Sequence, residues 1–523
     1  MSPITPTTIE AAPAVAIPSK KDSAARRQIR GSSLLLLGQL LAKGVNFGIQ
    51  VMIVRYLSQS DYGAFAYGLS IVTLGQSIAT FGLDRAITRY VPIYHEQRDY
   101  NKLFGTLLMV VALIASLGVT MALLLQGAPG LAARMLGSEP QAFSLLLILI
   151  FLSPVQALDG VLVGMFAVFS SSRSIFFRKY VLGPGLKLGV VLLLILLRSD
   201  VYFLAGGYLA ATSLAVAIYT AILLRVMQTQ GVFAHFHWRT IQIPWREVFS
   251  FTLPLLTSDI LYAVMNTMDA VVLEHSRGSV DVAALRAVQP MAVLNSLVMS
   301  SFALLFTPLA ARMFARNDRE GINNLYWQTA IWIAVITFPV FALTFSVAQP
   351  ITLLLYGSRY AQSAIILALL SLGYYFDAAL GFNGLTLKVY GKVRYSVVIN
   401  ILAGVFNLGA IMVLIPRYGA VGAAIGTCSA LIVHNILKQA GLRLGTGINL
   451  FEWRYFRVYL VILLCALGLL LVQVTTSAPV YVSFALAVLA SAVVIGLNRK
   501  LLKVGQIFPE IQRLPFARHL FGE

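Results

Sequence analysis

Long apolar runs dominate the chain, and short stretches rich in Gly, Pro or charged residues separate them. A membrane-spanning helix needs about twenty mostly apolar residues. By this measure the pattern predicts an all-α integral membrane protein with 14 transmembrane helices. The predicted segments are 33–54, 62–83, 104–126, 142–168, 180–197, 201–223, 249–273, 282–311, 325–347, 361–387, 395–415, 420–440, 455–474 and 479–497.

Composition supports a membrane protein. Of 523 residues, 59% are hydrophobic and only 11% are charged, against about 25% charged in soluble proteins. A net charge of +19 could indicate nucleic acid, but the basic residues are spread over many loops and form no compact basic domain. We therefore expect no nucleic-acid partner and no protein-bound cofactor. The two cysteines, Cys428 and Cys465, lie in apolar runs and predict neither a disulfide framework nor a CxxC site.

The distribution of Lys and Arg predicts the orientation. With the N-terminus inside, and with Lys438 and Arg457 at the inner ends of their segments counted with the adjoining loop, the inward tails and loops hold 30 of the 39 basic residues, the outward loops hold 6, and three remain inside segments. Inner loops of membrane proteins carry such an excess. Both termini are therefore expected in the cytoplasm. Residues 1–30 are predicted to be a disordered, basic tail without a cleavable signal peptide, and residues 499–523 an amphipathic tail on the inner membrane surface.

The chain also contains a weak internal repeat. A shift of 219 residues places 54–78 on 273–297, and shifts of 220 and 216 place 136–138 on 356–358 and 206–213 on 422–429. Transporters are commonly built from such repeats, with the substrate site between them. The predicted organisation is a first six-helix lobe at 31–225, a cytoplasmic linker at 226–248, a second six-helix lobe at 249–445, and two further helices within 446–498.

The loops and motifs argue against an enzyme. All outward loops are short, so none can hold a polymerase or ligase domain, and the chain has no GxxxxGK[ST], HExxH or GxSxG motif. His235 and His237 lie among aromatic residues of an inward loop, and this composition favours an interfacial belt over a metal site.

Four strings carry a family resemblance: RYLSQSDYGAFAYG (55–68), FGLDRAITRYVPIY (81–94), LLYGSRYAQSA (354–364) and IPRYGAVGAAIGT (415–427). In this order they resemble the signatures of Wzx-like bacterial polysaccharide flippases, of the multidrug/oligosaccharidyl-lipid/polysaccharide exporter superfamily. The same Gly-rich strings also suit close helix packing in any membrane bundle.

The resemblance implies a fold, an activity and a location. The implied fold is a V-shaped, pseudo-symmetric pair of six-helix lobes with two additional C-terminal helices. The implied activity is to move an undecaprenyl-pyrophosphate-linked oligosaccharide from the inner to the outer leaflet of the bacterial cytoplasmic membrane, by alternating access through a wet, cation-lined cavity. Membrane lipids and the polymerase and export proteins of the same pathway are the implied partners, and coupling to H⁺ or Na⁺ is known or suspected in some members.

Three basic residues are assigned to segment interiors, where a charge costs about 2.5–3.5 kcal/mol and calls for an anionic partner. Lys43 lies near the middle of the first segment, and Gln39, Asn46 and Gln50 share its helical face. This stripe predicts the pyrophosphate and sugar site, although it could instead seal against another helix. Lys187 could also line the cavity or extend to the inner headgroups.

Arg286 is the third interior cation and is assigned to the same site. It could alternatively reach the outer interface or pair with Asp281. Four aspartates also lie within segments. Asp377, Asp259 and Asp159 are candidates for an ion-coupling site, with ion pairing as the alternative. Asp269 resembles an acid often found at the outer end of the family's seventh helix, and this resemblance implies a structural role.

Other functions stay open at this point. A cation-coupled multidrug exporter shares the lobes, but such exporters usually have twelve spans and an acid in the first helix, where this chain has Lys43. A lipid II flippase shares fourteen spans. A polysaccharide polymerase or ligase, or a structural scaffold, fits less well because of the short outer loops and the charges at mid-membrane.

Overall fold

The computed structural model describes residues 20–127, 130, 139–169, 175–476 and 479–502, and these form helices and turns without a strand. Within the described residues, side chains are described from Leu37 onward, except at a few positions in three helices. The helices of the first half are α1 (Lys20–Tyr56), α2 (Gln59–Thr80), α3 (Leu83–Glu96), α4 (Tyr100–Gly127), α6 (Pro140–Leu149), α7 (Leu152–Phe169), η1 (Phe177–Leu182), α9 (Gly183–Leu196), α10 (Val201–Thr229), η2 (Val232–His235) and η3 (Trp238–Thr240).

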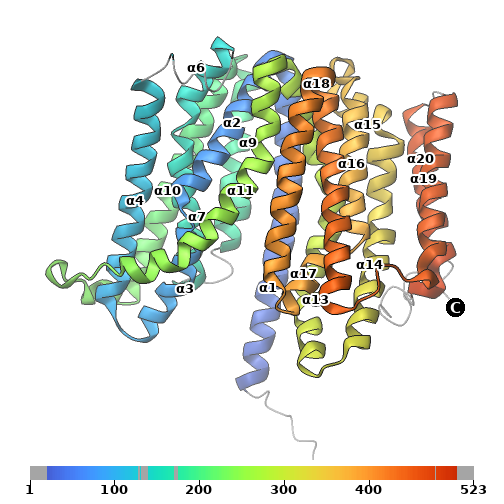
Figure 1. Cartoon of the computed structure of the whole chain (residues 1–523). Helices are drawn as coiled ribbons and strands as arrows, with labels where there is room; N and C mark the ends of the chain where they lie inside the picture. The colour runs from blue at the N-terminus through green and yellow to red at the C-terminus, as the bar shows by residue number, and fades with distance from the viewer. Residues whose placement is uncertain (1–19, 128–129, 131–138, 170–174, 477–478, 503–523) are drawn as a thin grey trace, which may run out of the picture.

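The second half continues without strands in its described residues (Figure 1). Its helices are α11 (Trp245–Arg277), α12 (Ser279–Val293), η4 (Leu294–Ser296), α13 (Leu297–Ala315), α14 (Arg319–Phe341), η5 (Ala342–Ser346), α15 (Ala348–Tyr356), η6 (Ser358–Tyr360), α16 (Ser363–Ala379), α17 (Asn383–Val389), α18 (Val393–Thr446), η7 (Trp453–Tyr455), α19 (Phe456–Thr476) and α20 (Val480–Leu502).

Each predicted segment falls on helical residues. Within the described part of the chain, 12 helices are long and apolar enough to cross a membrane. One of them, α18, is 54 residues long and joins two predicted segments across a break at Gly419, whose φ of 57° lies in the left-handed region. The structure thus establishes an all-helical membrane protein, while the number 14 stays a prediction.

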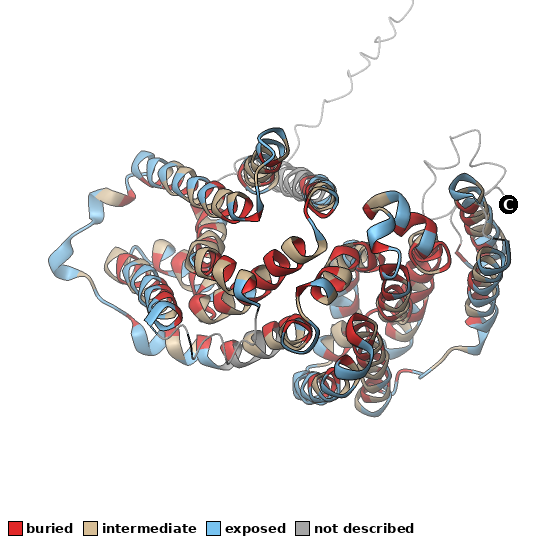
Figure 2. Cartoon of the chain, turned by 90° about the horizontal axis from the view of Figure 1, so that it is seen from above, coloured by how far each residue is buried: buried red, intermediate tan, exposed pale blue. Residues whose placement is uncertain are grey.

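Packing of buried residues divides the molecule into three regions. One apolar core combines residues of α2, α6 and α10 with residues of α12, α15 and α16, so both halves of the chain contribute to it. A second core belongs to α3, α4, α7 and α10, and a third to α13, α14, α16, α17, α19 and α20. The two halves therefore share a core at one end of the bundle and have separate cores at the other. Seen from above, buried residues gather inside each half (Figure 2).

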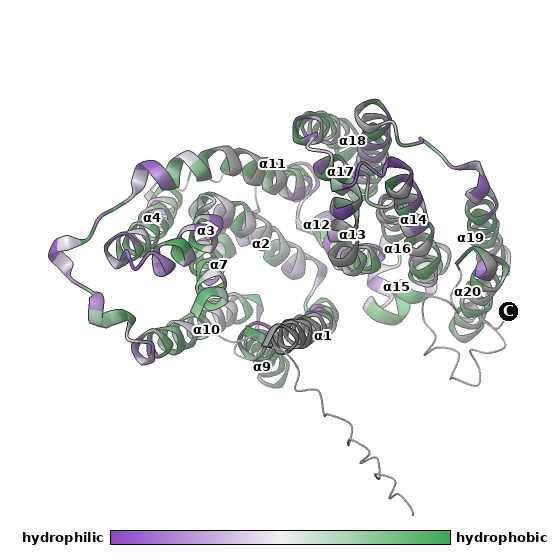
Figure 3. Cartoon of the chain, turned by 90° about the horizontal axis from the view of Figure 1, so that it is seen from below, coloured by the Kyte–Doolittle hydropathy of each residue, from purple (hydrophilic) through white to green (hydrophobic). Residues whose placement is uncertain are grey.

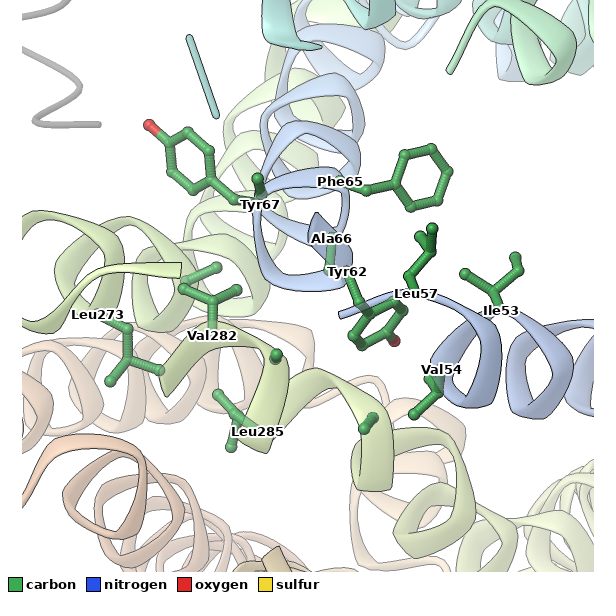
Figure 4. Close-up of a cluster of buried hydrophobic side chains, with 14 of the residues drawn as sticks. Ile53, Val54, Leu57, Tyr62, Phe65, Ala66, Tyr67, Leu273, Val282 and Leu285 are labelled. Atoms are coloured by element: carbon green, nitrogen blue, oxygen red, sulfur yellow. The ribbon is translucent and has the colours of Figure 1, made fainter. Parts of the chain in front are cut away.

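Backbone contacts hold the shared end together, and we call it the closed end. Arg55, at the end of α1, donates to the backbone carbonyls of Leu354 and Leu355, and Arg359 donates back to the carbonyl of Arg55 at 2.8 Å. A Cβ built on Gly63 of α2 would lie 1.7 Å from the carbonyl oxygen of Ser279 on α12. Apolar side chains of α1, α2, α11 and α12 pack beside these contacts (Figure 4).

Helix α11 connects the two halves. It begins at Trp245, within the predicted linker, and its first turn packs against the first half of the chain. Glu247 accepts hydrogen bonds from Tyr94 at 2.8 Å and from Lys102 at 3.1 Å. These hydrogen bonds hold the pKa of the Glu247 carboxyl below its usual range, with the Tyr94 hydroxyl as the largest cause.

Helices α19 and α20 pack on the outside of the second half, at one edge of the molecule (Figures 1 and 3). The hydroxyl of Ser346 in η5 donates to the carbonyl of Ala466 at 2.9 Å. This pair therefore lies away from the contacts between the halves.

Candidate functional site

A cavity of about 1070 Å³ lies between α1 and the second half of the chain. Its walls come from α1, α11, α12, α13, α16, α17 and α18. The size suits a large ligand, since drug-sized ligands occupy pockets of about 300–1,000 Å³.

The polar face of α1 forms one wall. Lys43, Asn46 and Gln50 line the cavity together with Phe47, as expected for one helical face. Gln39, one turn before Lys43, is exposed and lies outside the cavity lining. Three of the four residues of the predicted stripe therefore meet in one cavity.

Gln50 closes the cavity on the side of the closed end. Its side-chain amide donates to the hydroxyl of Tyr62 on α2 at 3.1 Å and to the backbone carbonyl of Arg286 on α12 at 3.0 Å. One residue of α1 thus contacts both halves of the chain where they meet.

Arg286 lines the cavity beside Gln50, but its charge is paired. Its guanidinium lies 2.8 Å from a carboxylate oxygen of Asp269, which is 5% exposed. The alternative that Arg286 pairs with Asp281 is therefore wrong, because Asp281 instead accepts a hydrogen bond from the backbone N–H of Ala420 at 3.1 Å. The ion pair joins Asp269 on α11 to Arg286 on α12.

A break between α16 and α17 forms the opposite wall. Gly381 adopts φ 72°, and a Cβ there would lie 2.8 Å from the Cβ of Ala330, so the chain turns where only glycine fits. The turn places Asp377 at the cavity, where its carboxylate accepts a hydrogen bond from Asn435 at 2.6 Å. Asn383 donates to the same Asn435 at 3.0 Å.

Two further lysines line this wall, and the sequence reasoning does not single them out. Lys388 follows the predicted segment 361–387 directly, and Lys438 lies near the inner end of segment 420–440, so both count with the inner loops. The structure places them at the cavity with His434. Their position at the inner ends of two apolar segments is the signal that could have identified them.

The cavity is consequently cationic. Its lining holds four cations, Lys43, Arg286, Lys388 and Lys438, against one carboxylate, that of Asp377. Only Arg286 is in an ion pair, and among the described residues no carboxylate pairs with the three lysines. Three positive charges are thus available to a ligand.

The remaining predicted residues lie elsewhere. Lys187 and Asp159 line a separate, smaller pocket of about 170 Å³ in the first half of the chain. Asp159 pairs with Arg178 at 3.1 Å, which supports the ion-pair alternative for this acid. Asp259 belongs to α11, but its side chain lies outside the described residues. Three candidate coupling acids thus do not form one site in the described structure.

Among the described residues, no group of three or more His, Cys, Asp and Glu side chains could hold a metal ion. His235 and His237 lie in the belt of aromatic residues, where His235 stacks on Tyr100 with ring centroids 4.4 Å apart. The prediction that no cofactor is bound stays a prediction.

The fold is that of a known class of membrane transporters. It is similar to a lipid II flippase in an inward closed conformation, with a TM-score of 0.69 and 14% identity over 89% of this chain and 98% of that protein. It is also similar to a multidrug resistance transporter of the MATE family in an inward-facing conformation, with a TM-score of 0.62 and 16% identity over 77% of this chain and 94% of that one.

Sequence comparison then identifies the family. The model of the polysaccharide biosynthesis protein family matches residues 29–314, and the MatE model matches residues 254–412. The capsular polysaccharide biosynthesis protein CapF of Staphylococcus aureus is 24% identical over 189 residues, which cover 36% of this chain and 48% of that protein. The chain belongs to the polysaccharide biosynthesis protein family, within the superfamily of flippases and exporters that the resemblance indicated.

Proposed function

We propose that the protein moves a polyprenyl-pyrophosphate-linked oligosaccharide, of the undecaprenyl type, from the inner to the outer leaflet of a bacterial cytoplasmic membrane. The product would serve the synthesis of an exopolysaccharide, a capsule or an O-antigen. The observation that carries this proposal is the cavity of about 1070 Å³ with three unpaired lysines.

The charge of the cavity suits a pyrophosphate. An unpaired charge within membrane-spanning helices is costly, so Lys43, Lys388 and Lys438 favour an anionic ligand. Lysine is a mobile point charge, which suits a phosphate contact that must form and then release. Asn46 and Asn400 supply neutral polar groups for hydroxyls of the sugar.

The arrangement of the cores suits alternating access. The halves share a core only at the closed end, so a rocking motion can separate them there while the opposite end closes. With both termini in the cytoplasm, the closed end faces outward and the cavity takes its substrate from the inner leaflet.

Coupling to H⁺ or Na⁺ belongs to this proposal through Asp377, the described candidate acid at the main cavity. Its carboxylate accepts a hydrogen bond from Asn435 at 2.6 Å. Membrane lipids surround the protein, and the polymerase and export proteins of the same pathway are the proposed partners.

A multidrug exporter is the second candidate, because the MatE model matches residues 254–412. The three unpaired lysines would repel a cationic drug. A lipid II flippase shares the fold and an anionic lipid-linked substrate, so substrate tests must separate it from the first proposal.

The experiment follows precursor export in cells. The gene is deleted, and the wild type, Lys43→Ala or Lys43→Arg is expressed at equal protein level. Surface polysaccharide and the inward-facing lipid-linked precursor are then measured. Peptidoglycan synthesis is measured in the same cells, because its loss on deletion would indicate a lipid II flippase instead. We expect Lys43→Ala to lower surface polysaccharide and accumulate the precursor, with partial rescue by Lys43→Arg. Full export by Lys43→Ala would refute the role of Lys43.

A further inference from the structure

A second pocket lies in the first half of the chain, separate from the main cavity. It measures about 170 Å³ and lies between α1, α7, η1, α9 and α10. Helices α1 and α9 contact one another and lie side by side at one edge of the molecule seen from below (Figure 3). The pocket is too small for an oligosaccharide, so a ligand there must be a small group.

Positive charge surrounds this second pocket. Lys179 and Lys187 line it, and so does the carboxylate of Asp159. Arg178 lies directly behind the lining, because it pairs with Asp159 at 3.1 Å. Three cations thus face one carboxylate, and neither lysine is in an ion pair among the described residues.

Arg178 supplies an independent sign that this region suits an anion. Its side chain is 1% exposed, yet Nε and Nη2 have no hydrogen-bond partner in the described structure. Its guanidinium lies over the rings of Phe166 and Tyr219, with Cζ at 5.0 and 4.6 Å from their centroids. A buried guanidinium with unpaired donors favours an anion nearby.

The backbone at this point is also specialised. Residues Phe177–Leu182 form a π-helix that continues directly into α9. Short π-helical segments are rare and occur frequently at functional sites. This one places Lys179 at the pocket that Lys187 reaches from the next turns, and places Arg178 behind its lining, beside Asp159.

The second pocket adjoins the main cavity. Asn46 of α1 lines both, so a ligand in either one contacts the same helix. Lys43, one turn before Asn46, lies on the main cavity alone.

We propose that the second pocket is a phosphate-binding site, occupied by the phosphate of a membrane lipid. Where that lipid is the polyprenyl carrier, the inference rests on the proposed function, and the pocket receives the carrier's phosphate beside α1 before the main cavity does. An anionic phospholipid headgroup or free inorganic phosphate offers the same chemistry.

Binding measurements on the full-length protein test this site. The protein is placed in phosphatidylcholine nanodiscs, and the binding of undecaprenyl phosphate is titrated. Lys179→Gln and Lys187→Gln are compared with the wild type and with Arg225→Gln. Arg225 is an exposed cation of α10 outside the pocket lining, so its variant controls for the loss of one charge.

We expect each pocket variant to weaken binding by about tenfold, as for loss of a charge-assisted contact, while Arg225→Gln stays near the wild type. Competition identifies the source of the phosphate. If phosphatidylglycerol displaces undecaprenyl phosphate, the pocket accepts any anionic headgroup, and if inorganic phosphate displaces it, the pocket binds the free anion. If neither displaces it, the pocket is specific for the polyprenyl carrier. Wild-type affinity for all three probes in both pocket variants would overturn the proposal. Because the assay measures binding alone, it separates failure of this site from failure of flipping.

Discussion

Replacement of Gly63 by alanine tests the closed end of the molecule. Gly63 lies on α2 where this helix meets α12 of the other half, and a Cβ there would lie 1.7 Å from the carbonyl oxygen of Ser279. Contacts under about 3.0 Å are essentially never seen for a real Cβ. The clash is with backbone, so no side-chain rotation relieves it, and α2 and α12 must move apart.

The steric clash of Gly63→Ala destabilises only the conformation in which the closed end is formed. Overpacking of this kind costs about 1–3 kcal/mol, and the open arrangement, in which the halves separate here, avoids it. A bias of about 1–3 kcal/mol shifts a two-state equilibrium by about 5–150-fold. We therefore expect Gly63→Ala to populate the open arrangement and to slow export, which needs both states.

Cysteine labelling measures this shift. The two native cysteines are replaced by alanine, and Ser279, which is buried, is replaced by cysteine. An impermeant maleimide added outside should label Ser279→Cys faster in the Gly63→Ala background. The matched control is Gly206→Ala, where an added Cβ meets nothing within 4 Å. Unchanged labelling together with normal export would refute the closed-end argument.

Three further outcomes follow from the described contacts. Asp159→Asn removes the carboxylate beside buried Arg178, and we expect a loss of about 2–3 kcal/mol, less than for a fully buried pair because Asp159 is 40% exposed; an unchanged thermal midpoint in detergent would contradict this. The pKa of Glu247 lies below its usual range in the folded protein, so ionised Glu247 stabilises the fold at pH values above the ordinary glutamate pKa, and this stabilisation is lost as pH falls through the lower folded value. In a plot of thermal midpoint against pH, Glu247→Gln should therefore reduce the fall of the midpoint at acid pH. An unchanged acid side of the plot would show that Glu247 does not contribute to this pH dependence. Asp377→Asn should abolish any dependence of transport on a proton or sodium gradient in vesicles, and wild-type transport that ignores both gradients would remove the coupling role.

Much of the fold could be predicted because the length of an apolar run is enough to identify a membrane helix. The boundary between α9 and α10, for instance, follows from polar residues at 198–200, where Asp200 caps α10 by accepting from the N–H of Phe203 at 3.0 Å. Likewise Lys43, Asn46 and Gln50 share a face through helical period alone, and the structure places all three at one cavity.

Contacts between distant helices could not be predicted. The partner of Arg286 is Asp269 on α11, which hydropathy cannot distinguish from Asp281, five residues away on the same helix as Arg286. Lys438 and Arg178 lie close to the inner ends of predicted segments. A basic residue at such a position can belong to an inner loop or point into the protein, and the sequence pattern is the same in both cases.

Translocation by the purified protein tests the central claim most directly. The protein is reconstituted into vesicles with a polyprenyl-pyrophosphate-linked oligosaccharide, and the fraction of sugar exposed on the opposite leaflet is followed with time. We predict that Lys43→Gln and Lys438→Gln each slow translocation by about tenfold, as expected when one charge-assisted contact of about 1.5 kcal/mol is lost, while Arg225→Gln stays at the wild-type rate. Wild-type translocation by a variant with Lys43, Lys388 and Lys438 all changed to Gln would contradict the account.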